Sequence, residues 1–178
     1  MTEAYREELA ELTARAEQYL QHSRIDLPHR HELLRLWRDP SFGSYTSWRV
    51  YTPFDRYGEA DLPIAVRVTW NRPFDYMRFR DPMKGLKHGL GIEPTVERKE
   101  AELSRSELDS RLAALQTIKI PVVIDTGVSI DGVGFGFEIF GRTAVRLEWR
   151  SMMHGGWKPM IDWAKEMTSF LDETLEAT

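Results

Sequence analysis

The last third of the chain, residues 121–175, is the segment that most constrains the fold. Asp131-Gly132 and Gly141-Arg142 separate runs of apolar and β-branched residues, and the run after the second pair ends at Trp149. Asp-Gly readily adopts the positive φ angles that a two-residue hairpin turn requires. We therefore predict a β-hairpin across Asp131-Gly132, with the apolar run Ile118–Ile124 before it as a central strand of a sheet.

An amphipathic helix is predicted after these strands, over residues 158–176. Pro159 suits the first turn of a helix, where its lack of an N–H group removes no hydrogen bond. Apolar side chains then recur at helical spacing: Met160, Trp163, Ala164, Met167, Phe170, Leu171 and Leu175. Such a stripe predicts that the helix packs against the sheet.

Glycines alternate in the strand that follows Asp131. Gly132, Gly134 and Gly136 have the spacing of a phosphate-binding loop, but such a loop leads into a helix, and here a strand follows. We interpret Gly134 and Gly136 instead as positions that leave room for a neighbouring side chain or a bend.

Residues 1–40 form a helical segment in this interpretation. Thr2–His22 has apolar residues at helical spacing, and its first turns hold glutamates, where the helix dipole favours negative charge. A second, short helix is predicted from His29 to Trp37, because Pro28 precedes it and Asp39-Pro40 would end it.

Residues 45–150 are predicted to be mainly sheet. Tyr45–Tyr51 and Leu62–Trp70 are rich in aromatic and β-branched residues, and Phe74–Arg80 alternates in the manner of a third, exposed strand. Residues 95–103 alternate weakly. The segment Ser104–Glu107 has the pattern of a capping box, which predicts one intervening helix.

Together these patterns predict an α+β fold and a single domain, residues 1–178. An antiparallel sheet of about five to seven strands would pack against the N-terminal and C-terminal helices. A chain of 178 residues is long enough to bury one hydrophobic core of this kind.

Composition narrows the possible environments and partners. The chain has no cysteine, and its longest apolar runs fall short of the roughly 18 residues that cross a bilayer. Its first residues lack the pattern of a secretory signal peptide. We therefore expect a soluble, cytoplasmic protein without a membrane partner. The net charge of -4 makes nucleic acid an unlikely partner.

A local basic segment lies between Arg67 and His88. Its arginines and lysines alternate with aromatic residues, a combination that is typical of protein interfaces and of single-stranded nucleic-acid sites. An ordinary solvated sheet face and a site for a polyanion remain the alternatives. We predict that Tyr76, Arg78 and Arg80 contact a protein partner.

The loop at residues 154–157 supplies the other predicted contacts, His154 and Trp157. His154 could also serve as a general base beside a sheet carboxylate, which is the alternative of a small enzyme. The candidate carboxylates are Asp125, Asp131, Glu138 and Glu148, and their spacing selects no pair. His29 and His31 diverge on a helix and lack further ligands, so no metal or other cofactor is expected.

The hairpin at Asp131-Gly132, the strand ending in Trp149, the Gly155-Gly156-Trp157 loop and the helix with Trp163 resemble the endings of small bacterial immunity proteins that neutralise contact-delivered toxins. The resemblance implies a non-catalytic, cytoplasmic protein that occludes a cognate toxin. A binder of a small molecule or lipid, with a pocket between the last helix and the sheet, is a further alternative.

Overall fold

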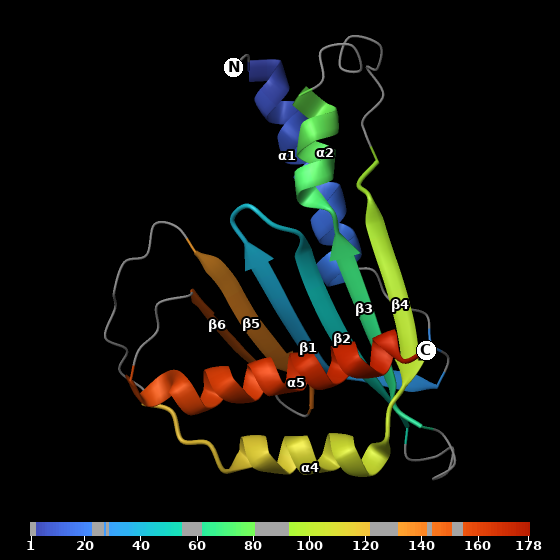
Figure 1. Cartoon of the computed structure of the whole chain (residues 1–178), viewed down its shortest axis with the longest axis vertical. Coiled ribbons are helices and arrows are strands. Elements are labelled where there is room, and N and C mark those ends of the chain that lie inside the picture. Colours follow the sequence, from blue (N-terminus) through green and yellow to red (C-terminus); the bar gives the residue numbers. More distant parts are fainter. Residues whose placement is uncertain are drawn as a thin grey trace.

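The chain forms one six-stranded antiparallel sheet with helices on both faces (Figure 1). This confirms the predicted α+β fold. The computed structural model describes residues 3–22, 27, 29–54, 62–80, 93–121, 132–141, 144–150 and 155–178. In spatial order the strands are β4 (Val96–Glu102), β3 (Ile64–Trp70), β2 (Tyr45–Pro53), β1 (Arg30–Pro40), β5 (Val133–Ile139) and β6 (Val145–Arg150).

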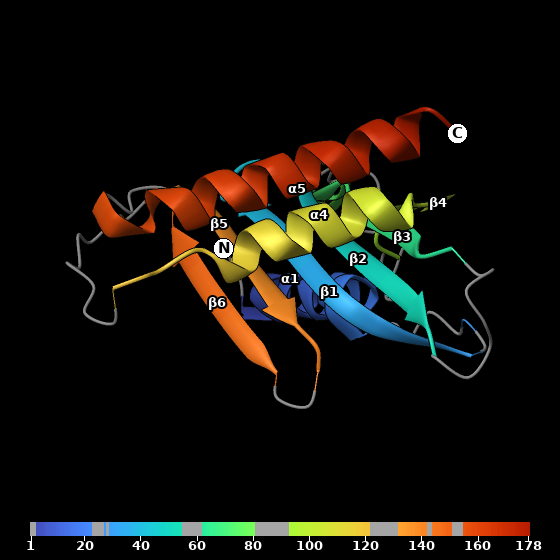
Figure 2. The same ribbon diagram turned by 90° about the horizontal axis from the view of Figure 1, so that it is seen from below.

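One face of the sheet is covered by α5 (Lys158–Glu176), and α4 (Arg105–Gln116) lies beside α5 (Figure 2). The predicted stripe of α5 is buried in full, so its role is confirmed. It packs against Leu34, Leu36, Trp48 and Phe137 of the sheet. Ser104 caps α4 as predicted, because its hydroxyl accepts a hydrogen bond from the Glu107 N–H.

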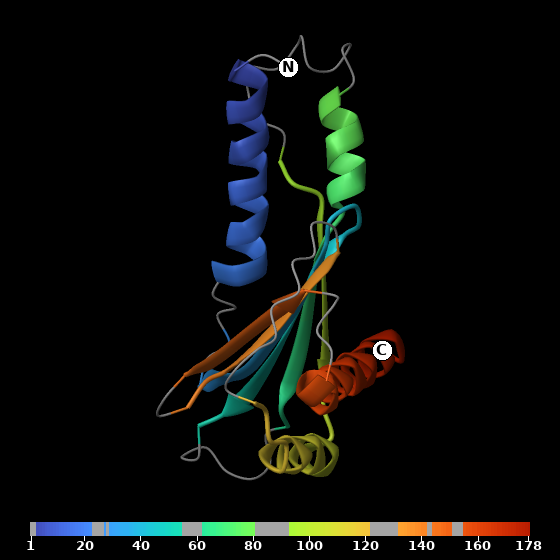
Figure 3. The ribbon, with the colours of Figure 1, turned by 90° about the vertical axis from the view of Figure 1, so that its left-hand side faces the viewer.

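The opposite face is covered in part by α1 (Glu3–Glu17), which continues into a short π-helix, η1 (Gln18–His22) (Figure 3). Leu12, Ala16 and Leu20 form a second core with side chains of β2 and β3. The Arg49 guanidinium and the Ser47 hydroxyl both donate to the Leu20 carbonyl, at 2.5 and 3.0 Å. These bonds fasten the end of the helix to the sheet.

No helix among the described residues is long and apolar enough to span a membrane.

The predicted second helix at His29–Trp37 is wrong, because Arg30–Pro40 is strand β1. Leu34 and Leu36 are buried under α5, whereas Arg35 and Trp37 face the α1 side. β1 pairs with β2 along one edge and with β5 along the other. The hydrogen bonds to β2 come from the neighbouring segment and those to β5 from a distant one, and together they outweigh the local breaks that suggested a helix.

The predicted third strand at Phe74–Arg80 is also wrong, because Arg72–Arg80 is helix α2. Asn71 caps this helix, since its side-chain oxygen accepts from the Phe74 N–H at 3.3 Å. Pro73 occupies the first turn, where proline is tolerated. The alternating pattern was misleading because helical spacing of the same residues also buries one consistent face.

The hairpin predicted across Asp131-Gly132 would pair β5 with the segment before it, and Asp131 lies outside the described residues. Both edges of β5 are paired, one with β1 and one with β6, so a preceding strand has no place beside it. Residues 118–121 of the predicted central strand are not in a strand, and residues 122–131 lie outside the described residues. The strands predicted on either side of Gly141-Arg142 are confirmed, because β5 and β6 pair as antiparallel neighbours; Arg142 itself lies outside the described residues.

Candidate interaction surfaces

A buried carboxylate fixes α2 to the end of the sheet. Asp75 is 0% exposed and accepts hydrogen bonds from the Trp70 indole N–H at 2.8 Å and from the Thr95 N–H at 2.7 Å. The Thr95 hydroxyl donates at 2.7 Å, and the Arg78 guanidinium pairs with the same carboxylate at 3.1 Å. Because β3 ends at Trp70 and Thr95 precedes β4, this one side chain joins α2 to both strands.

The inner face of α2 contains Tyr76, one of the predicted contact residues. Its ring packs edge-on against Trp70, with centroids 6.0 Å apart, and belongs to the core on the α1 side. Phe79, one helical turn along, packs against the same core. Tyr76 is therefore placed mainly inside the protein, which follows from the helical rather than extended geometry of this segment.

The outer face of α2 exposes Phe74 and Met77, at 43% and 65% of their surface. The Arg78 guanidinium lies over the Phe74 ring, 5.5 Å from its centroid, and Arg80 is exposed at the end of the helix. Arg78 and Arg80 were both predicted as contacts, and α2 brings them together with apolar side chains. Met77 was missed because a strand pattern places it on the face opposite Phe74 and Arg78.

A third exposed apolar side chain, Phe42, stands on the turn between β1 and β2 with 87% of its surface exposed. Arg72, the first residue of α2, bonds to the Pro40 carbonyl, to the Gly43 carbonyl at 3.3 Å and to the Asp39 carboxylate at 2.8 Å. The turn is thus tied to the start of α2. We name Phe42, Phe74, Met77, Arg78 and Arg80 the α2 surface.

The charges on the α2 surface are basic. The carboxylate of α2, Asp75, is fully buried, so the exposed charges of the helix come from Arg78 and Arg80. Arg67, from the predicted basic segment, lies elsewhere: it binds Asp172 at 2.7 Å and Glu176 at 2.5 Å on the α5 face. Burial opposes the charge on Arg67, but these hydrogen bonds outweigh it and raise its pKa. The basic segment is therefore divided between two faces.

The predicted loop contacts are placed differently. Trp157 is 6% exposed and belongs to η3 (Gly155–Trp157), directly before α5, so its side chain lies inside the protein. His154 lies outside the described residues, as do Asp125 and Asp131.

His31 contacts the Thr52 hydroxyl at 3.1 Å and the Phe54 ring. Within the described part of the chain, no three His, Asp or Glu side chains gather as for a metal.

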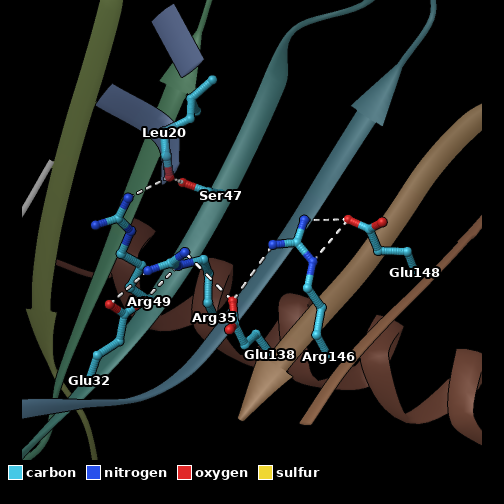
Figure 4. A network of polar contacts seen from close by, with 8 residues as sticks. All are labelled: Leu20, Glu32, Arg35, Ser47, Arg49, Glu138, Arg146 and Glu148. Atoms are coloured by element: carbon cyan, nitrogen blue, oxygen red, sulfur yellow. Dashed lines mark hydrogen bonds and ion pairs between the residues drawn. The ribbon is translucent and has the colours of Figure 1, made fainter. Parts of the chain in front are cut away.

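The other two candidate carboxylates, Glu138 and Glu148, join a row of ion pairs on the α1 side of the sheet (Figure 4). Arg35 makes paired hydrogen bonds to Glu32 at 2.8 and 3.0 Å and lies 3.7 Å from Glu138. Arg146 bonds to Glu148 at 2.5 Å and lies 4.0 Å from Glu138. The Glu148 hydrogen bond raises the pKa of Arg146. Arginine thus neutralises each of these carboxylates, which does not favour an acid and base pair.

The space between α5 and the sheet is small. A hollow of about 20 Å³ lies there, lined by Leu36, Phe135, Trp149 and residues of α5. This volume holds about one water molecule, so the described residues leave no room there for a lipid or a drug-sized ligand.

Comparison of the chain with protein-family models, curated proteins and solved structures found no match.

Proposed function

We propose that this is a non-catalytic protein that binds another protein through the α2 surface. The observation that supports this proposal most strongly is the exposure of three large apolar side chains, Phe42, Phe74 and Met77, on a framework fixed by Asp75 and Arg72. Exposed aromatic and methionine side chains with an arginine rim are the usual composition of a binding hot spot.

Burial of these side chains supplies enough free energy for a specific complex. Covering a phenylalanine or methionine side chain contributes about 1.5–3 kcal/mol. Because Asp75 and Arg72 already fix the backbone that bears these side chains, binding would not have to order this segment, which lowers its entropic cost. Loss of all three should therefore weaken binding by at least ~100-fold, or about 2.7 kcal/mol.

We further propose that the partner is a bacterial toxin and that the protein occludes it in the cytoplasm, without a cofactor and without turnover. This part of the proposal depends on the resemblance of the C-terminal third to immunity proteins. In the fold, that third forms β5, β6 and α5, which build the core under the sheet. The α2 surface, outside that third, would then determine which toxin is recognised.

The experiment compares three tagged forms of the full chain in extracts of the native cell. These are the wild type, a triple variant Phe42→Ser, Phe74→Ser, Met77→Ser, and a control Val145→Ser. Val145 is also exposed, at 50%, but lies on β6, away from α2. We expect one protein to be recovered with the wild type and the control and to be lost with the triple variant, and the purified pair to reproduce the difference in Kd.

Equal recovery with all three forms would refute binding through the α2 surface. The toxin assignment has a separate test, in which the captured protein is expressed alone and together with each form. Growth arrest that the wild type and Val145→Ser relieve, and that the triple variant does not, is the expected result. A captured protein that does not impair growth would refute the immunity role and leave the binding surface intact.

A further inference from the structure

Strand β4 forms one edge of the sheet, and no strand among the described residues pairs with its outer side (Figure 1). On its inner side, the Asn71 N–H bonds to the Thr95 carbonyl at 3.0 Å, and the Leu103 N–H bonds to the Pro63 carbonyl at 2.8 Å. Because backbone groups alternate in direction along an antiparallel strand, the odd-numbered residues of β4 bond to β3. The even-numbered residues therefore direct their N–H and C=O groups away from the sheet.

The backbone of β4 is suited to pair with a further strand. Edge strands are commonly protected by proline, by a bulge or by very short length. β4 has seven residues and no proline, and it pairs with β3 in unbroken register from Val96 to Glu102. Its protection consists of charged side chains. These oppose pairing with most strands, but they favour a strand that brings opposite charges to the same positions.

A second copy of β4 is such a strand. Lys99 is the middle residue of β4, so a copy that pairs antiparallel over the full length places Arg98 of each chain opposite Glu100 of the other. The outward-facing residues of both strands then meet and form roughly eight backbone hydrogen bonds. A shift by two residues in either direction would place Arg98 opposite Arg98 or Glu100 opposite Glu100, and such pairs of like charge are destabilising. The charges thus favour the full-length register.

The side chains on both faces of β4 fit this register. Arg98 and Glu100 form an ion pair within one chain and are 47% and 40% exposed. The antiparallel copy sets a second such pair beside the first in reverse order, so each carboxylate lies between two guanidinium groups. On the α5 face, Lys99 of one copy meets Lys99 of the other, but each already bonds to Glu176 at 2.7 Å. Glu176 therefore offsets the repulsion between the two lysines.

We propose that the protein forms a two-fold symmetric dimer by antiparallel pairing of β4 with β4 of a second copy, which joins two six-stranded sheets into one. No residue of the α2 surface takes part. Arg78 of α2 bonds to Thr95 at 3.1 Å, so α2 lies at the end of β4 that begins with Val96. The antiparallel arrangement therefore places the two α2 surfaces at opposite ends of the joined sheet, and the dimer does not depend on the function proposed for them.

Sedimentation equilibrium of the purified full chain at several concentrations tests the dimer. A pair of seven-residue strands is a small interface, so we expect a Kd on the order of 10 µM. Arg98→Glu and Glu100→Arg should each weaken association at least ~10-fold, because two attractive cross-strand pairs become repulsive. The double variant Arg98→Glu, Glu100→Arg restores opposite charges and should return to within ~3-fold of the wild type. Circular dichroism checks that each variant is folded.

Two controls separate this edge from other surfaces. Val145→Lys adds a charge to β6, at the other edge of the sheet, and the triple variant Phe42→Ser, Phe74→Ser, Met77→Ser removes the apolar part of the α2 surface. Both should dimerise as the wild type does. A wild type that stays monomeric up to ~1 mM, about a hundredfold above the expected Kd, would overturn the proposal. Unchanged association of Arg98→Glu and Glu100→Arg, a double variant as weak as the single ones, or loss of the dimer in either control would also overturn it.

Discussion

Asp75 is the side chain on which the position of α2 depends most, and its replacement by alanine is the sharpest test of the fold. Alanine removes the acceptor of the Trp70 and Thr95 N–H groups and the partner of Arg78. A buried donor left without a partner costs about 1–3 kcal/mol, and two N–H groups lose their acceptor, whereas the Arg78 guanidinium, with 34% of its side chain exposed, is rehydrated. Since these contributions overlap, we expect the free energy of unfolding to fall by about 3–5 kcal/mol.

Urea denaturation followed by circular dichroism measures this change, with Arg78→Met as the matched control. Arg78 keeps 34% of its side chain exposed, so its ion pair is screened by solvent, and we expect a loss of less than ~1 kcal/mol. For Asp75→Asn we expect a loss of unfolding free energy between those of the other two variants. The amide keeps the shape of the carboxylate, but its NH2 group would face the N–H donors of Trp70 and Thr95. A loss below ~1 kcal/mol for Asp75→Ala would refute the argument that this carboxylate anchors α2.

Three further predictions concern the rest of the sheet. Gly136→Ala should lower the free energy of unfolding by about 1–3 kcal/mol in urea denaturation, because its Cβ would collide with the Trp37 ring, and an unchanged midpoint would contradict this. Leu171→Ala should lower the free energy of unfolding by about 2–5 kcal/mol in the same assay, since Leu171 is fully buried on the inner face of α5; a loss under ~1 kcal/mol would show that the contact matters little. Hydrogen bonds from Lys99 and Arg67 lower the pKa of Glu176 below its ordinary value of 4.5, so its stabilising contribution is present above that value and is lost as pH falls through the lowered pKa. Glu176→Gln should therefore make the decline of Tm at acidic pH shallower, and parallel Tm profiles for variant and wild type would disprove the linkage.

The elements predicted correctly are those whose pattern is local and repeated. The stripe of α5 spans five turns, so its period could be recognised without its neighbours. Ser104 and Glu107 specify the start of α4 within four residues. The strands β2 and β3 are rich in β-branched and aromatic residues, which suit a sheet buried on both faces.

Of the two elements predicted wrongly, β1 is decided in part by pairing with a distant strand, and α2 by a local cap that was overlooked. β1 contains a leucine-rich run that fits a short helix, and its strand geometry comes from pairing with β2 and β5. α2 contains alternating aromatic and charged residues that fit a strand. There the overlooked signal was Asn71 before Pro73, a helix cap followed by a proline in the first turn.

The same error changed the candidate site. With Phe74–Arg80 as a strand, Phe74 and Arg78 share a face with Tyr76 and Arg80. The helix instead turns Tyr76 inward and exposes Met77 together with Phe74. Phe42 lies thirty residues before the start of α2 in the sequence, and the bonds of Arg72 to the β1–β2 turn connect them. Such a surface is assembled by tertiary structure, so no local pattern could have identified all of it.

Oxidation of Met77 is the most direct measure of whether the α2 surface binds the partner. In the free protein, peroxide should oxidise Met77, which is 65% exposed, well before the buried Met160 and Met167. In the complex with the captured partner, we predict that Met77 is oxidised at least ~10-fold more slowly, because the partner covers it. Oxidation of Met77 at the same rate in the free protein and in the complex would contradict the proposed binding surface.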